Sequence, residues 1–409
     1  MPFLADKITI ILKELFPKPV VLHEPVFKGN EWDYVKQCFD TGWVSTAGAF
    51  VDRFEEDLAT FTGAKHVVAT VNGTSALHIA LLLAGVKPGD EVLTPALTFV
   101  ATANCALYCG ANIDFVDIDP VTYNLSTACL EEKLIQAEKQ GQLPKIVIPV
   151  HFAGQSCDMA RIHALSIKYD FKIIEDASHA VGGKYCGEPI GNCRYSDITV
   201  FSFHPVKIIT AGEGGMALTN APSLAKKMKF LRSHNITSSA IEMDDRPSEE
   251  IWNYQQIGLG FNYRMSDIHA ALGLRQVERL DEFVAKRHAL AQRYNELLTE
   301  MPITKPKQIA ESFSSFHLYV IRLKLREINN SQRQVFAAFY EQGVRVNLHY
   351  IPVYLQPFYQ NRGFKRGYCP EAEAYFSEAM SIPVFPTLSK EQQDYILEIL
   401  KNTTNNKSV

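Results

Sequence analysis

Two side chains of complementary chemistry follow two short apolar segments of this chain. The segments 171–174 and 198–203 are rich in Ile, Val and Phe and are bounded by turn residues, which predicts two buried β-strands. Asp176 stands where the first segment ends, and Lys207 follows the second by four residues. Ligands of open α/β sheets collect beyond the carboxyl ends of the strands, so we expect both side chains there. Such a pair suits pyridoxal phosphate (PLP): the amine condenses with its aldehyde, and the carboxylate keeps its pyridine nitrogen protonated.

Each of these residues alone also has an ordinary explanation. An Asp that follows a strand is often the N-cap of a helix, and a single Lys beside glycines is commonly just solvated. Two neighbouring features favour the functional interpretation. Ser202 stands five residues before Lys207, and Gly-Glu-Gly-Gly follows at 212–215. We therefore predict that Asp176 and Lys207 are catalytic and bind the cofactor.

Another strand-to-helix junction is suited to a phosphate group. An apolar run at 66–71 leads into Asn-Gly-Thr-Ser, and a helix is predicted to start near Thr74. Free N–H groups and the helix dipole make a helix N-terminus attractive to anions. Gly73, Thr74 and Ser75 are therefore candidates to hold the phosphate, with Ser202 closing the site from the other side. The residues alone leave open that Thr74 or Ser75 is simply the N-cap.

The order of the predicted elements indicates an α/β protein. Strands and helices alternate as far as about residue 220, which predicts a largely parallel sheet with helices on both faces. No Gly-x-Gly-x-x-Gly follows a strand, so the fingerprint of a dinucleotide-binding fold is absent. After about residue 285, two long helical segments flank an alternating strand at 317–323, which predicts a smaller α+β lobe. We predict an N-terminal helix and linker at 1–25, a large PLP-binding domain at 26–285, a small C-terminal domain at 286–402 and a polar tail at 403–409.

Some local patterns are specific enough to test. Ser266 is a good N-cap for a long amphipathic helix. A helix at 221–234 is followed by a polar stretch that is long enough to form a mobile loop over the site. The pattern at 344–354 by itself predicts an edge strand.

Composition excludes several classes of function. The net charge is −4, from 41 basic and 45 acidic residues, and no long like-charge run is present. This argues against nucleic acid or an anionic membrane as a partner. The eight cysteines form no Cys-x-x-Cys and no zinc-type spacing, so we expect no metal site and reduced thiols. Residues 8, 11, 12, 15 and 16 are apolar at helical spacing and no run of 18 apolar residues exists, so we expect an amphipathic helix rather than a signal peptide, and a cytoplasmic protein.

Several longer motifs resemble one enzyme family. They are His-Phe-Ala-Gly-Gln-Ser-Cys-Asp-Met at 151–159, Glu-Asp-Ala-Ser-His-Ala at 175–180, the segment 194–207 that ends in Lys207, Leu-Gly-Phe-Asn-Tyr-Arg-Met-Ser-Asp at 259–267 and Leu-His-Tyr-Ile-Pro-Val-Tyr at 348–354. From about residue 22 to 400 the chain is similar to the DegT/DnrJ/EryC1/StrS sugar aminotransferases. The resemblance implies the PLP-dependent transferase fold of type I, with a mostly parallel mixed sheet in the large domain.

The resemblance also implies roles for residues that chemistry alone does not single out. His179 would bond the hydroxyl of the PLP ring, and Phe99 would stack on that ring. Asn262 would reach the phosphate bound by a neighbouring subunit. Structural alternatives stay open: Phe99 in the core, His179 satisfied by the backbone, Asn262 in a turn and the loop 45–48 as a plain connection. The residues implied to contact the nucleotide-sugar are Ser45, Thr46, Ala47, Gly48, His349 and Tyr350.

The same resemblance implies substrates and partners. An amino group would move from L-glutamate to C4 of a UDP-linked 4-keto-6-deoxy-N-acetylhexosamine, as in pseudaminic acid biosynthesis, within a homodimer that shares its active sites. The N-terminal part, with Leu-His-Glu-Pro at 22–25, is more similar to aminotransferases of legionaminic acid synthesis. That pathway, or another 4-amino-4,6-dideoxy sugar, is the alternative. A non-catalytic PLP-binding regulatory homologue is the alternative from another class.

Overall fold

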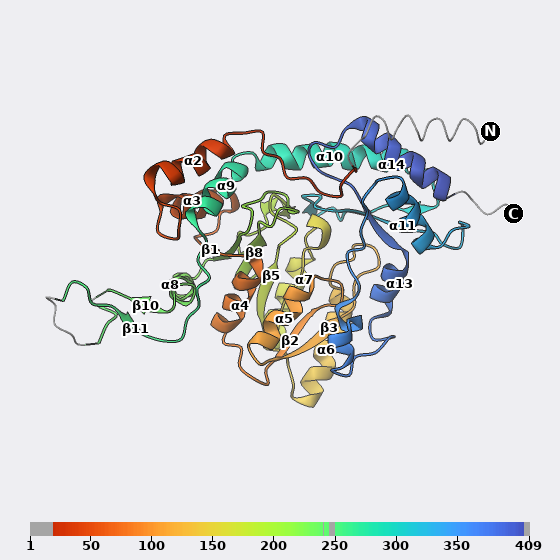
Figure 1. Ribbon diagram of the computed structural model, residues 1–409. Helices are drawn as coiled ribbons and strands as arrows, with labels where there is room; N and C mark the ends of the chain where they lie inside the picture. Colours follow the sequence, from red (N-terminus) through yellow and green to blue (C-terminus); the bar gives the residue numbers. More distant parts are fainter. Residues whose placement is uncertain (1–18, 240, 245–249, 405–409) are drawn as a thin grey trace.

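The computed structural model describes residues 19–239, 241–244 and 250–404 of the chain (Figure 1). The predicted N-terminal helix lies outside the described residues, as does most of the predicted polar tail. At the centre is a seven-stranded sheet in the order β1-β9-β8-β5-β4-β2-β3. Its strands are β1 (His66–Thr70), β2 (Glu91–Pro95), β3 (Asn112–Val116), β4 (Ile146–Val147), β5 (Lys172–Asp176), β8 (Ile198–Ser202) and β9 (Gly215–Thr219).

The sheet is mixed but mostly parallel, as the sequence predicts. Strands β3, β2, β4, β5 and β8 pair in parallel, whereas β9 runs antiparallel to both β8 and β1. Parallel neighbours need a crossover connection, which contains a helix in each case except between β5 and β8, where the chain forms only the short strands β6 and β7. The antiparallel β9 instead returns directly from β8 through the segment that carries Lys207. Lys207 therefore lies on a connection between adjacent strands, not on a crossover helix.

Helices cover both faces of the sheet. Side chains alternate between the faces along a strand, so Ile174 packs into the core beneath α4 and α5, whereas Ile173 packs under α6 and α7. A further core joins β8, β9 and β1 to α3 and α9. These helices are α3 (Ala49–Thr62), α4 (Gly73–Leu83), α5 (Val100–Tyr108), α6 (Thr127–Gln140), α7 (Met159–Tyr169) and α9 (Asp267–Val277). Two buried faces explain why the strands are continuously apolar.

The long helix predicted after Ser266 is divided in two. Ser266 is the N-cap, because its side chain accepts a hydrogen bond from the His269 amide, but α9 ends at Val277 and α10 (Leu280–Leu297) begins after a break. Helix α2 (Glu31–Thr41) packs beside α9 (Figure 1).

The C-terminal part forms an antiparallel sheet in the order β12-β14-β15 with helices against it. Its core also takes in Val20, which bridges to Val344 and so attaches the N-terminal segment. Residues 353–375, however, pack against the core of the central sheet. The domain boundaries stay a prediction. These elements are β12 (Ile303–Thr304), β14 (Tyr319–Leu323), β15 (Ala379–Ile382), α11 (Gln332–Glu341), α12 (Pro357–Gln360), α13 (Pro370–Glu378) and α14 (Lys390–Thr403).

Two local predictions are wrong. Residues 344–354 form no edge strand: Asn347 makes one isolated bridge to Ser381, and a 3₁₀ turn, η2 (Val353–Leu355), follows. Helix α8 (Pro222–Leu231) ends three residues earlier than predicted, and His234 and Asn235 have left-handed backbone angles that stop a helix.

Beyond α8 the chain forms an arm rather than a loop over the strand ends. Strands β10 (Ile236–Thr237) and β11 (Gln255–Gln256) pair antiparallel at its base, and the arm projects from the body (Figure 1). A small separate sheet contains β6 (Lys184–Tyr185), β7 (Glu188–Pro189) and β13 (Ser312–Phe313). Within the described ranges, no helix combines the length and apolarity that crossing a membrane requires.

Candidate active site

The carboxyl ends of β5 and β8 open into a cavity of about 410 Å³. The two strands are parallel neighbours that end at Asp176 and Ser202, so their last side chains emerge at the same edge. The N-termini of α4 and α5 and the segment 347–350 complete the walls. Nine residues predicted from sequence line this cavity: Gly73, Thr74, Phe99, Asp176, His179, Ser202, Lys207, His349 and Tyr350.

Asp176 is held on both sides of its carboxylate. Its Oδ2 accepts a hydrogen bond from the Thr102 hydroxyl at 2.7 Å, and its Oδ1 accepts one from the Ser178 amide at 3.1 Å. Its backbone is fixed as well, because the His151 amide donates to its carbonyl oxygen. Asp176 therefore presents a fixed acceptor to the cavity. Thr102 was missed in the sequence, where a Thr inside a helix gives no sign of a partner on a distant strand.

Lys207 lies on the turn that follows β8, where its amide bonds the His204 carbonyl oxygen. Burial lowers the pKa of the Lys207 amine to about 8, although the nearby carboxylate of Asp176 acts to raise it. Loss of water penalises the charged ammonium more than one carboxylate stabilises it. About a tenth of the amine is thus neutral and nucleophilic at pH 7, compared with about 0.03% for an ordinary lysine.

His179 packs among aromatic rings with one nitrogen free. Its Nε2 lies 3.1 Å from the Tyr350 hydroxyl, its ring packs on His317 at 4.3 Å, and its buried Nδ1 has no hydrogen-bond partner. Burial, followed by the charge of Lys207, lowers the pKa of His179 well below its ordinary value. His179 is therefore a neutral imidazole that can bond a polar ligand atom. His349, whose pKa burial lowers to about 3, bonds Ser381 through Nδ1 at 2.9 Å.

The residues predicted to hold a phosphate lie at the N-terminus of α4, where one detail of the sequence-based interpretation needs correction. Neither Thr74 nor Ser75 is the N-cap of α4: Asn72 caps it, its Oδ1 accepting from the Ser75 amide at 2.8 Å. The first helical N–H groups have no partner within the helix and can bind an anion. A Cβ added to Gly73 would lie 3.0 Å from Ser202 Cβ, a tight contact that would push against Ser202, so glycine keeps this approach open. Cradle, amine, carboxylate and the free His179 nitrogen together fit PLP.

Some predicted residues lie elsewhere. Ser75 is not part of the cavity wall. Asn262 is exposed and accepts hydrogen bonds from the Arg264 guanidinium through Oδ1. The loop from Ser45 to Gly48 packs against the start of α9: the Ser45 carbonyl accepts from the Asp267 amide, and a Cβ on Gly48 would fall 1.9 Å from the Asp267 carboxylate. Within this one chain, Asn262, Ser45, Thr46, Ala47 and Gly48 do not line the cavity.

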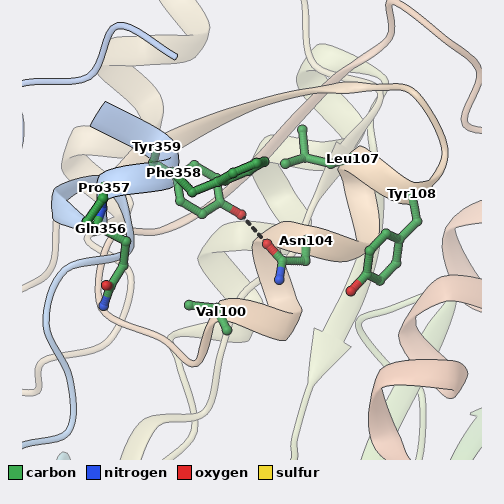
Figure 2. Close-up of a pocket in the computed structure, with 8 residues that line it drawn as sticks. All are labelled: Val100, Asn104, Leu107, Tyr108, Gln356, Pro357, Phe358 and Tyr359. Atoms are coloured by element: carbon green, nitrogen blue, oxygen red, sulfur yellow. Dashed lines mark hydrogen bonds between the residues drawn. The ribbon is translucent and has the colours of Figure 1, made fainter. Parts of the chain in front are cut away.

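A second cavity, of about 450 Å³, lies between α5 and α12 (Figure 2). None of the predicted site residues lines it, and its wall carries no ionisable group other than two tyrosines. Asn104 and Tyr359 bond each other across it at 2.6 Å. It offers neither an amine nor a carboxylate. Among the described residues, no cluster of three or more His, Cys, Asp or Glu could hold a metal ion.

Comparison with known proteins places this geometry in context. The model of the DegT/DnrJ/EryC1/StrS aminotransferase family matches residues 25–401. The GDP-perosamine synthase of Caulobacter vibrioides is 37% identical over 378 residues, which cover 92% of this chain and 96% of that protein.

Solved structures agree. The Helicobacter pylori aminotransferase PseC, involved in pseudoaminic acid biosynthesis, superimposes with a TM-score of 0.85 at 27% identity, covering 95% of this chain and 99% of that one. The putative sugar aminotransferase Spr1654 of Streptococcus pneumoniae, in its PMP-form, gives a TM-score of 0.85 at 30% identity over 94% of this chain and 98% of that one, and has also been solved in a PLP-form. The predicted cofactor, PLP, and the predicted fold are thereby confirmed.

Proposed function

Because this chain belongs to the DegT/DnrJ/EryC1/StrS aminotransferase family, we propose that it carries the amino group of L-glutamate to C4 of a UDP-linked 4-keto-6-deoxy-N-acetylhexosamine. The chain is a PLP-dependent sugar aminotransferase; the donor, the nucleotide, the sugar and the position of amination are the proposal. The observation that carries it is the meeting of Lys207, Asp176 and the Gly73–Ser202 cradle in one cavity.

Each side chain has a task that its surroundings support. Bound PLP supplies an aldehyde for amines and a ring that takes up electrons. The Lys207 amine, whose lowered pKa makes its neutral form accessible near neutral pH, would bind the aldehyde and later take up and return a proton at Nζ. The Asp176 carboxylate would accept a hydrogen bond from the ring nitrogen and so keep that nitrogen protonated. His179 Nδ1 would bond the ring hydroxyl, Phe99 would stack on the ring, and Thr74 and Ser202 would bind the phosphate.

The remaining predicted residues need a second subunit. Asn262 and the loop 45–48 are absent from the cavity of their own chain. We assign them to the cavity of a partner in a homodimer, Asn262 toward the phosphate and the loop toward the nucleotide-sugar. His349 and Tyr350 would contact the sugar from the same chain as Lys207.

The identity of the sugar has two supports of different kinds. Structural similarity to PseC favours a sugar on the route to pseudaminic acid. The motifs from residue 151 onward favour the same route, because they resemble those of the UDP-4-amino-4,6-dideoxy-N-acetyl-β-L-altrosamine transaminase. The N-terminal part instead favours the legionaminic acid route. The 37% identity to a GDP-perosamine synthase favours a GDP-linked substrate as the second candidate.

Product identification distinguishes these candidates. Purified protein is incubated with glutamate and, separately, with UDP-linked 4-keto-6-deoxy sugars of both configurations at C5 and with a GDP-linked 4-keto-6-deoxyhexose. We expect NMR to show a 4-amino sugar from a UDP substrate only. A product from the GDP sugar alone would contradict the proposed nucleotide. A cofactor absorbance that glutamate leaves unchanged would instead support the regulatory homologue.

A further inference from the structure

The hydrogen bond from Thr102 to Asp176 joins two elements that are far apart in the sequence. Thr102 lies in the first turn of α5 and Asp176 at the end of β5, and the two side-chain oxygens are 2.7 Å apart. Thr102 is 1% exposed and Asp176 5% exposed, so water does not compete for this bond. Both residues also border the cavity.

The direction of each proton in this cluster follows from the chemistry of the groups. An ionised carboxylate only accepts hydrogen bonds, and a Thr hydroxyl has one proton. Thr102 uses that proton on Asp176, so the Thr98 hydroxyl, 2.8 Å away, must donate to Thr102. With the Ser178 amide on Oδ1, each oxygen of Asp176 has one donor and keeps a lone pair for the cavity.

Three threonines at the C-terminal ends of helices behave differently. A Thr in a helix commonly bonds the carbonyl oxygen four residues earlier. Thr41, Thr62 and Thr403 do so, with Gln37, Leu58 and Ile399 as acceptors. Thr102 instead bonds a carboxylate on another element. Packing and helix geometry account for the first three hydroxyls but not for this one.

We propose that Thr98 and Thr102 are positioning residues that aim the Asp176 carboxylate at the nitrogen of the PLP ring. The inference rests on the role given to Asp176 under the proposed function. Without the Thr102 hydroxyl, the buried Oδ2 would lose its protein donor, and the carboxylate could turn away from the ring nitrogen. A hydrogen bond to a buried charge is stronger than one between neutral groups, so the effect should be easy to measure.

The test replaces the hydroxyl by a methyl group of the same size. For Thr102→Val we expect the dissociation constant of PLP, from fluorescence titration of the apo-protein, to rise about tenfold. The kcat should fall while the KM for glutamate stays nearly unchanged, because the substitution leaves the residues that contact glutamate intact. Thr102→Ser, which keeps the hydroxyl, should restore both values to within about twofold. Thr98→Val, one bond further away, should raise the dissociation constant about threefold.

Thr94→Val is the matched control. Thr94 is fully buried in β2 and bonds only the Ile148 carbonyl oxygen at 3.2 Å, so its loss should leave PLP affinity unchanged. Wild-type affinity in Thr102→Val, or an equal loss in Thr94→Val, would overturn the proposal. If Thr102→Val fails to fold, Thr98→Val becomes the test, and an unchanged dissociation constant of PLP in Thr98→Val would overturn the proposal. Wild-type protein that binds PLP but leaves it unchanged with glutamate would count against the proposed function instead.

Discussion

Glu175 and Asp176 are neighbours on β5, yet their side chains face two very different surroundings. Asp176 points into the cavity with one donor on each oxygen. Glu175 points to the opposite face, where His151 Nε2 at 2.6 Å and the Thr199 hydroxyl at 3.2 Å donate to it, together with Ser196. Burial acts to raise the pKa of Glu175, but these hydrogen bonds outweigh it and hold the pKa below its ordinary value. Hydrogen bonds within the protein satisfy the carboxylate of Glu175, whereas the carboxylate of Asp176 can still accept hydrogen bonds from a ligand.

The partner of Glu175 supports this distinction. His151 is fully buried, and its Nδ1 accepts from the Cys157 amide at 3.1 Å. Its proton must therefore lie on Nε2, where it is donated to Glu175. No atom of the Glu175 pair lines the cavity. Burial of a charge thus indicates function only where the surrounding protein leaves part of its bonding capacity unused.

The largest effect is expected in the cavity that Asp176 faces, at the amine of Lys207. Lys207→Ala removes the group that binds the aldehyde and moves the proton, and proton transfer alone contributes about 10²–10⁴-fold. Turnover should fall by at least about a thousandfold, measured by the absorbance change of the cofactor on mixing with glutamate. Lys184→Ala, at an exposed lysine on β6, should behave as wild type. Wild-type turnover in Lys207→Ala would refute the assignment.

The two carboxylates themselves should separate activity from stability. Asp176→Asn should lower kcat about a hundredfold, with little change in the free energy of unfolding of the apo-protein. Glu175→Gln places an amide against donors and should lower that free energy by about 3 kcal/mol. Its kcat per folded molecule should stay within about threefold of wild type. Urea unfolding and kinetics on the same samples measure both.

An opposite pattern would contradict the comparison. If Asp176→Asn destabilises the protein as much as Glu175→Gln does, Asp176 is a structural carboxylate. If Glu175→Gln abolishes turnover in folded protein, the closed network takes part in the chemistry.

Much of the cavity at the ends of β5 and β8 could be predicted from the sequence. The apolar runs identified β5 and β8, and the rule for strand ends brought Asp176, Ser202 and Lys207 together. What sequence does not carry is direction and distance. Nothing in 215–219 distinguishes an antiparallel strand from a parallel one. The partners of Thr102 and Glu175 lie 74 and 24 residues away, respectively, and only the assembled sheet brings them close.

Errors arose where local patterns compete. Asn, Thr and Ser at 72–75 are all good N-caps, and the backbone of Asn72, extended at φ −165°, decides for Asn72. The polar composition of 235–250 suggested a loop over the site, but the described part of this stretch begins with β10, which pairs with β11 in an arm that projects from the body (Figure 1). The motif that contains Asn262 came from resemblance, and one chain by itself gives that residue no ligand to contact.

The cradle offers a smaller effect that also corrects the sequence-based interpretation. Gly73→Ala would force a methyl group to within 3.0 Å of Ser202 Cβ, so we expect the dissociation constant of PLP to rise about tenfold. Ser75→Ala changes a residue that does not line the cavity and should raise that constant less than about twofold. Fluorescence titration of both apo-proteins measures the difference. A larger loss in Ser75→Ala would restore Ser75 as a phosphate ligand.

The smallest effect concerns pH and the apo-protein. The rate at which apo-protein captures PLP depends on the neutral form of the Lys207 amine, so it should rise with pH and level off near pH 8, not near the ordinary lysine pKa of 10.5.

The free energy of unfolding of the apo-protein should depend on the same pKa. Between about pH 8 and 10.5 the folded state binds fewer protons at Lys207 than the unfolded state, so the stability of wild type rises with pH in that window. Apo Lys207→Met, which has no charge to bury, should therefore be more stable than wild type at pH 7, and the gap should narrow as the pH passes 8. A stability difference between Lys207→Met and wild type that does not change with pH, or a rate of PLP capture that still rises above pH 9, would show that the amine is solvated. The contrast between the surroundings of Asp176 and those of Glu175 would then lose its electrostatic basis.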